Sequence, residues 1–139
     1  MRVNWIAIIV ADIVLFLLGY VWYDFLFGKM WMAEMAKVNP QFQAMTAGAG
    51  AYPFIVSLVM GFFAAYGLAR MLGWRGDWSV GRAAFIGFSM GLLIFGSMTY
   101  MDYVYSGFGM TLGWINVGFV AVGLAIQGVV LALMKPKAA

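Results

Sequence analysis

Four uninterrupted apolar stretches constrain this chain of 139 residues more than any other feature of its sequence. Crossing ~30 Å of hydrocarbon takes about 20 residues of helix. Within each stretch the apolarity is continuous, whereas an outer-membrane strand is about 10 residues long and alternates polar with apolar side chains. The stretches therefore predict four membrane-spanning helices, at residues 3–23, 52–72, 83–101 and 112–134.

The composition excludes an ordinary soluble domain, because 65% of the residues are hydrophobic and 9% are charged, against about 25% charged in soluble domains. The chain has neither cysteine nor histidine, which removes thiolate metal ligands, the commonest general base and the usual haem ligand. We expect a single all-α transmembrane domain over residues 1–139, a four-helix bundle without a metal, a cofactor or catalytic activity.

Lysine and arginine are distributed unevenly around the predicted spans. Six of the eight basic residues lie on the side that holds both termini and the middle loop, and two lie on the other side: Arg2, Arg70, Arg75, Arg82, Lys135 and Lys137 against Lys29 and Lys37. Because cytoplasmic loops carry the excess of basic residues, we expect both termini in the cytoplasm. The basic residues form no run, which argues against a nucleic-acid partner.

The long external loop at residues 24–51 has two parts. Its first half mixes apolar anchors with charges and predicts an interfacial helix at residues 29–37 that stops before Pro40. Trp31 and Met35 are four residues apart and should share the buried face of this helix. The second half, with Gly48-Ala49-Gly50, is expected to be a flexible lead into the second span.

Three segments near the N-terminus together resemble the pattern of a known family: Asn4-Trp5, Gly19-Tyr20-Val21-Trp22-Tyr23 and Leu26-Phe27-Gly28-Lys29-Met30-Trp31-Met32. The pattern is similar to that of the small bacterial four-helix membrane proteins grouped as domain-of-unknown-function family 1761. The resemblance implies this fold and a place in the bacterial inner membrane. It implies no activity, so no functional residue is carried over.

Asp12 is the sharpest candidate for a functional residue, because it lies near the middle of the first span, where a charge costs ~2.5–3.5 kcal/mol on insertion scales. It should face protein or water, either as a proton or cation site or as a hydrogen-bond partner of Gln127, Ser89 or Tyr66. Asn116, Gly123 and Gln127 form a polar stripe along one face of the fourth span. That stripe is either a polar pathway or a set of interhelical hydrogen bonds.

Small residues recur every four positions on two spans and predict close-packing faces. The faces are Gly61, Ala65 and Ala69 on the second span and Ala83, Gly87 and Gly91 on the third. They can pack within one chain or between protomers, and a four-helix unit this small can bury only part of them. The expected partners are the lipid bilayer and either a second copy or a larger membrane complex.

The outer ends of the first and third spans carry Asp24 and Asp102, each after an aromatic cluster. Such carboxylates can serve acid–base chemistry as a pair or can cap a span in the headgroup zone. Methionines also gather on the outer side, and without cysteine or histidine they fit an adaptable apolar surface better than a copper site.

Two classes of function remain open. The first is a non-catalytic accessory subunit or self-associating membrane scaffold. The second is a small oligomeric transporter or channel that uses Asp12 and the Asn116/Gln127 stripe. Co-purification with a larger complex would favour the first, and a homo-oligomer around a wet cavity would favour the second.

The charge distribution predicts the topology. A reporter fused after Lys137 should be cytoplasmic and a reporter inserted near Gln43 should be external, because the basic residues concentrate on the side of the termini. Compartment-specific reporter activity measures both positions. Finding both reporters on the same side would contradict four spans with cytoplasmic ends.

Overall fold

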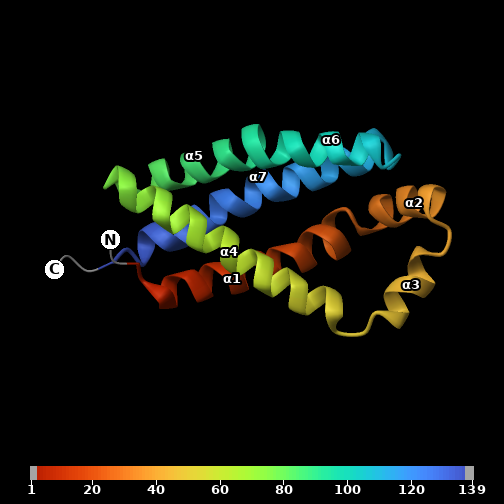
Figure 1. Cartoon of the computed structure of the whole chain (residues 1–139), viewed down its shortest axis with the longest axis horizontal. Helices are drawn as coiled ribbons and strands as arrows, with labels where there is room; N and C mark the ends of the chain where they lie inside the picture. The colour runs from red at the N-terminus through yellow and green to blue at the C-terminus, as the bar shows by residue number, and fades with distance from the viewer. Residues whose placement is uncertain (1–2, 137–139) are drawn as a thin grey trace.

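The computed structural model describes residues 3–136, and over that range the chain is built from helices joined by short loops (Figure 1). Arg2 and Lys137, two of the basic residues used for the topology, lie outside the described residues. The elements in chain order are α1 (Trp5–Tyr20), the π-helix η1 (Val21–Leu26), α2 (Gly28–Val38), α3 (Phe42–Gly48), α4 (Tyr52–Arg75), α5 (Val80–Met90), the π-helix η2 (Gly91–Gly96), α6 (Ser97–Tyr105) and α7 (Gly109–Leu133).

Four continuous helices are long and apolar enough to cross a membrane. They are Trp5–Leu26, in which η1 continues α1, then α4, then Val80–Tyr105, which joins α5, η2 and α6, and then α7. Helices satisfy every backbone hydrogen bond internally, as hydrocarbon requires. The predicted class, an all-α bundle of four spans, is confirmed, and the chain is a multi-pass membrane protein.

Helix α7 is the centre of the arrangement, because it packs against the first, second and third spans. Figure 1 shows α7, in blue, running beside the α5–α6 helix and crossed by α4. Half of its most apolar stretch is buried inside the chain, against 17% for the Val80–Tyr105 helix. That third helix packs mainly on α7, so most of its circumference faces outward.

Backbones approach closely where α5 and η2 cross α7. A Cβ added at Gly87 would overlap the carbonyl of Leu124, and one added at Gly91 would meet the backbone of Val120 and Ala121. From the other side, a Cβ at Gly128 would overlap the carbonyl of Ala83. The predicted small-residue face of the third span is therefore used within the chain, since only small residues permit this approach.

The small-residue face of the second span is also used inside the chain. Ala65 and Ala69 are almost completely buried, with exposed fractions of 0% and 2%. They belong to a core that α1 completes with Ala7, Ile8 and Ala11. Neither predicted small-residue face is therefore left for a second protomer.

The first and third spans each contain one π-helical segment, η1 in the first and η2 in the third. A π-turn inserts a residue and leaves carbonyls without their usual partners. In the third span the hydroxyl of Ser97 donates to the carbonyls of Leu93 and Ile94, both at 2.9 Å. The side chain of Ser97 thus bonds back to the end of η2, where its backbone N–H also donates to the carbonyl of Ile94.

Asn4, the residue directly before α1, links the start of the first span to the end of the last. Its Oδ1 accepts hydrogen bonds from the N–H groups of Ile6 and Ala7, at 3.1 and 3.3 Å. Its Nδ2 donates to the carbonyl of Met134 at 2.9 Å, just after α7 ends. One side chain therefore caps α1 and joins it to α7, which explains the first part of the sequence pattern.

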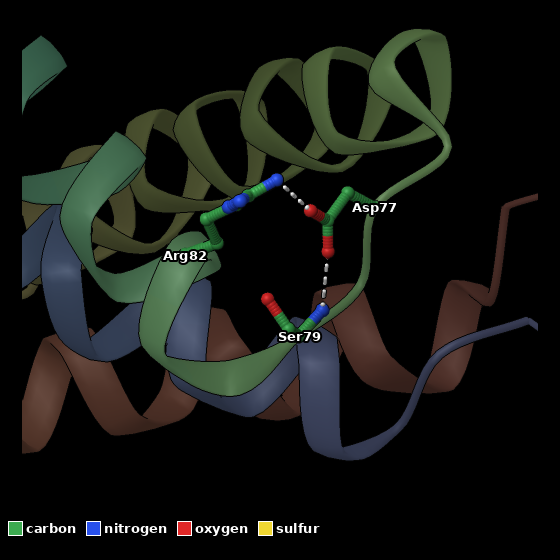
Figure 2. A network of polar contacts seen from close by, with 3 residues as sticks. All are labelled: Asp77, Ser79 and Arg82. Atoms are coloured by element: carbon green, nitrogen blue, oxygen red, sulfur yellow. Dashed lines mark hydrogen bonds and ion pairs between the residues drawn. The ribbon is translucent and has the colours of Figure 1, made fainter.

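The connection between α4 and α5 is a four-residue turn fixed by Asp77 (Figure 2). Gly76 ends α4 in the left-handed conformation, with φ of 68°. Asp77 accepts hydrogen bonds from the N–H of Ser79 at 3.0 Å and from Nη1 of Arg82 at 2.7 Å. The Ser79 bond above all, and then Arg82, lower the pKa of the Asp77 carboxyl below its ordinary value. Asp77 is therefore ionised at neutral pH and neutralises Arg82.

The long connection between the first and second spans contains two helices. The predicted helix at residues 29–37 is confirmed as α2, which ends at Val38, two residues before Pro40. Met35 is buried and Trp31 is half-buried, as their shared face predicts. The expected flexible lead is wrong in part, because residues Phe42–Gly48 form α3. Phe42 anchors this short helix by packing edge-on against Trp31, with ring centroids 5.1 Å apart.

The α5–α7 crossing predicts a sharp contrast between two glycines of one helix. Gly87→Ala should lower the free energy of unfolding by about 1–3 kcal/mol, because the new methyl group meets backbone that cannot move aside. Gly81→Ala is the matched control: nothing lies within 4 Å of its Cβ position, and alanine favours the helix. Unfolding in detergent micelles, followed by tryptophan fluorescence, measures both. Equal stability of the two variants would contradict the crossing.

Candidate functional site

Asp12 lies inside the bundle, where α1 crosses α4. Its side chain is 8% exposed, and its Oδ1 lies so close to the backbone of Gly61 that a Cβ there would overlap it. Glycine at position 61 is therefore what lets the carboxyl group enter the helix crossing. Asp12 therefore faces protein, as its place in the first span predicts.

Gln127 reaches the same crossing from α7. It is completely buried, and its Nε2 donates to the carbonyls of Gly61 at 3.2 Å and Ala11 at 3.4 Å. One amide thus joins α7 to both α1 and α4. We call Asp12, Gly61 and Gln127 the central polar cluster.

Two oxygens of the central polar cluster have no hydrogen-bond donor among the described residues. They are Oδ1 of Asp12 and Oε1 of Gln127, and both are buried. A buried acceptor without a partner costs free energy in a medium of low dielectric constant. The carboxylate of Asp12 can take up a proton, and both oxygens can accept a hydrogen bond from a water molecule or bind a small cation, so this cluster has the chemistry of an acceptor site.

A second polar contact lies in the half of the bundle away from Asn4 and Met134, which we call the outer half. The hydroxyl of Tyr23, on η1, donates a hydrogen bond to Oδ1 of Asn116, on α7. Nδ2 of Asn116 donates to the carbonyl of Leu112, one turn earlier, at 2.8 Å. Both polar ends of the amide are therefore engaged. Its nitrogen bonds within α7, and its oxygen accepts the bond that joins α7 to η1.

Aromatic side chains surround this contact. Nε1 of Trp22 donates to the carbonyl of Ile115 at 3.0 Å, and a Cβ at Gly118 would overlap the ring of Trp22. The ring of Tyr23 lies 5.1 Å from Phe119 and 5.7 Å from Trp31. The outer aromatic cluster consists of Trp22, Tyr23, Trp31, Asn116 and Phe119, and it accounts for the Gly-x-x-Trp-Tyr part of the sequence pattern.

The polar stripe predicted on α7 is divided between these two clusters. Asn116 bonds to η1, whereas Gln127 bonds to α1 and α4. Between them, a Cβ at Gly123 would overlap Cδ1 of Leu15 and contact Cδ2 of Leu18. The hydrocarbon of α1 therefore fills the space between the clusters, and this packing does not support a continuous polar path through one chain.

None of the three expected partners forms a hydrogen bond with Asp12 among the described residues. The Nε2 of Gln127 donates to backbone carbonyls instead, and the other two candidates lie elsewhere. Ser89 is half-buried on α5, which packs against α7, and no hydrogen bond joins it to Asp12 in the described part of the chain. The hydroxyl of Tyr66 accepts instead from Nη1 of Arg70, at 3.4 Å.

The outer carboxylates are not engaged as a pair. Asp24 lies in η1 and Asp102 in α6, each before the end of its helix, and both side chains are exposed. Over residues 3–136 the ion pairs are Lys37–Glu34 and Arg82–Asp77, and neither includes Asp24 or Asp102. In the same range, no group of three Asp or Glu side chains could hold a metal ion.

Sequence reasoning missed the bond between Tyr23 and Asn116. The sequence pattern contained the signal, because it places a tryptophan and a tyrosine in succession on a span. Their partners depend on η1, which turns both rings toward α7. Regular α-helical spacing of 100° per residue does not describe a π-helical segment.

Comparison with known proteins identifies one family. The family model described as Protein of unknown function (DUF1761) matches residues 6–132, nearly the whole described chain. No curated protein and no solved structure matches the chain. The family resemblance expected from the N-terminal segments is confirmed.

The outer aromatic cluster predicts that Tyr23 and Tyr20 differ in their contribution to stability. Tyr23→Phe should lower the free energy of unfolding by about 0.5–1.5 kcal/mol, because it removes the hydrogen bond to Asn116 and keeps the ring. Tyr20→Phe is the matched control, since Tyr20 is 67% exposed one turn earlier. Thermal unfolding in micelles compares them. A Tyr23→Phe variant as stable as the control would show that the bond contributes nothing.

Proposed function

The chain belongs to the DUF1761 family of proteins of unknown function, and we propose that it is a non-catalytic protein of the bacterial inner membrane. It acts as an accessory subunit of a larger complex or as a self-associating scaffold, with both termini in the cytoplasm. The observation that carries this proposal is the division of the polar stripe by the packing of Leu15 and Leu18 against Gly123.

The polar side chains inside the bundle mainly hold helices together. Gln127 bonds to the backbones of two neighbouring helices, Trp22 bonds to the backbone of α7, and Asn116 bonds to Tyr23. Hydrogen bonds of this kind join membrane helices. A transport path needs polar groups along its length, whereas these groups form two separated clusters.

The outward face of the third span is the surface we assign to lateral association. This helix packs mainly on α7, and Phe85 and Phe88, three residues apart on α5, are 69% and 42% exposed. Large aromatic side chains carry much of the energy of helix and protein contacts. A partner helix, from a second copy or from another subunit, would cover this face.

Lateral association is testable with the full chain extracted in mild detergent. A stoichiometric partner or a homo-oligomer should co-purify with the tagged protein, and Phe85→Ala with Phe88→Ala should weaken that association by at least about 1 kcal/mol. Phe63→Ala, on the exposed face of α4 with 60% exposure, is the control. A monomer without any partner, or equal association of both variants, would contradict the proposal.

Proton or cation transfer is the second candidate function, and the unpaired oxygens of Asp12 and Gln127 favour it. Of the two groups, the carboxyl of Asp12 can take up and release a proton, and the amide oxygen of Gln127 can accept a hydrogen bond or bind a cation. The remaining path would have to form between protomers, because Leu15 and Gly123 close the interior of one chain.

Substitutions at Asp12 separate the two candidates. If the role is structural, Asp12→Asn should keep the fold, because an amide of nearly the same shape fits beside Gly61, and Asp12→Leu should lower the free energy of unfolding by roughly 1–3 kcal/mol, because its branched side chain must displace neighbouring groups there. If the role is transfer, Asp12→Asn should abolish proton flux into liposomes and leave stability unchanged. Unfolding in micelles and flux measured with a pH-sensitive dye give both readouts. Proton flux in the wild type that Asp12→Asn abolishes would overturn the proposal of an accessory subunit or scaffold.

A further inference from the structure

Arg70 is held between two aromatic rings near the end of α4. Its Cζ lies 5.9 Å from the ring centroid of Tyr66, one turn earlier, and 5.6 Å from that of Trp74, one turn later. Its Nη1 also donates to the hydroxyl of Tyr66 at 3.4 Å. These contacts fix a side chain that otherwise keeps much rotamer freedom. The guanidinium is therefore oriented before any ligand arrives.

The positive charge of Arg70 has no carboxylate partner within residues 3–136. The two ion pairs in that range are Lys37–Glu34 and Arg82–Asp77, and Figure 2 shows Asp77 engaged by Arg82 and Ser79. A guanidinium has five N–H donors, and the contact with Tyr66 uses one of its nitrogens. Such a planar fork matches the oxygens of a phosphate group.

The residues around Arg70 are those of a membrane interface. Trp74 is 70% exposed one residue before α4 ends, and Trp5 is 54% exposed at the start of α1. The ring of Trp5 stacks on Tyr66, with centroids 5.6 Å apart and an angle of 4° between the ring planes. Tryptophan concentrates at the headgroup level of bilayers. We call Trp5, Tyr66, Arg70 and Trp74 the Arg70 corner.

An apolar surface continues from this corner toward the middle of the membrane. Trp5 also stacks on Phe62, with ring centroids 6.4 Å apart, and Phe62 packs edge-on against Phe63, which is 60% exposed. A ligand with a phosphate group and a hydrocarbon chain matches this arrangement, in which a guanidinium is followed by an apolar aromatic surface. A soluble phosphate would leave the aromatic surface unused.

Further positive charge lies close by. The bond from Asn4 to the carbonyl of Met134 brings the end of α7 beside the start of α1, so Lys135 follows directly at this end of the bundle. Its side chain is exposed. Basic residues near a bilayer surface attract anionic lipid, so the surroundings favour an anionic over a zwitterionic headgroup.

We propose that the Arg70 corner is a binding site for an anionic phospholipid. The guanidinium of Arg70 binds the phosphate oxygens, the rings of Tyr66 and Trp74 hold the guanidinium in place, and an acyl chain lies along Trp5, Phe62 and Phe63. This site is separate from the central polar cluster and does not depend on the proposed function.

Native mass spectrometry of the full chain in neutral detergent tests the site. Phosphatidylglycerol should bind at least about fivefold more tightly than phosphatidylcholine with the same acyl chains. Arg70→Gln should weaken phosphatidylglycerol binding about tenfold. Arg75→Gln removes the same charge five residues away on the same helix and should change binding less than about twofold. A large excess of inorganic phosphate should leave the lipid bound.

Trp74→Leu gives a second measurement that does not depend on how Arg70→Gln folds, because Trp74 is largely exposed. It should weaken phosphatidylglycerol binding about threefold through loss of the cation–π contact. Equal losses for Arg70→Gln and Arg75→Gln would show nonspecific attraction and overturn the site. Equal binding of both lipids, displacement by inorganic phosphate, or an unchanged Trp74→Leu variant would overturn it as well.

Discussion

The close approach of α7 to its neighbours is the interaction on which the rest of the structure depends. In hydrocarbon, helices gain little from burying apolar surface against each other, so their association relies on van der Waals contact and interhelical hydrogen bonds. Gly87, Gly91 and Gly128 allow backbone-to-backbone contact on one side of α7. Gln127 bonds to two further helices on the other side. Three spans thus pack on one helix. The first and second spans also contact each other, whereas the third is held mainly by α7.

This arrangement determines what the polar residues can do. Because α7 is shared, its polar side chains meet different neighbours along its length: η1 near the outer end and the α1–α4 crossing further in. Leucines of α1 fill the space between. The same geometry places the ends of α1, α4 and α7 together, where Asn4 joins two of them and Arg70 stands between two rings. Polar and charged groups here hold helices together or face the membrane surface.

The spans and the small-residue faces could be predicted from the sequence, because apolar length and a spacing of four residues are properties of a single helix. Which helix lies opposite a given residue is not such a property. Asn116 and Gln127 share one face of α7 as predicted, yet Tyr23 meets the first while the backbones of Ala11 and Gly61 meet the second. The π-turn of η1, which changes the direction of Trp22 and Tyr23, has no simple residue pattern. Helix α3 escaped prediction because its contact with Trp31 comes from another segment.

Water access to Leu15 tests most directly the claim that the two polar clusters are separated. The chain contains no cysteine, so Leu15→Cys can be labelled in membranes with a charged, membrane-impermeant thiol reagent, with Ser106→Cys in the exposed loop between α6 and α7 as the reference. The structure predicts that Ser106→Cys reacts rapidly and that Leu15→Cys stays unlabelled from both sides. Labelling of Leu15→Cys at a rate close to the reference would show water between the clusters and contradict the account.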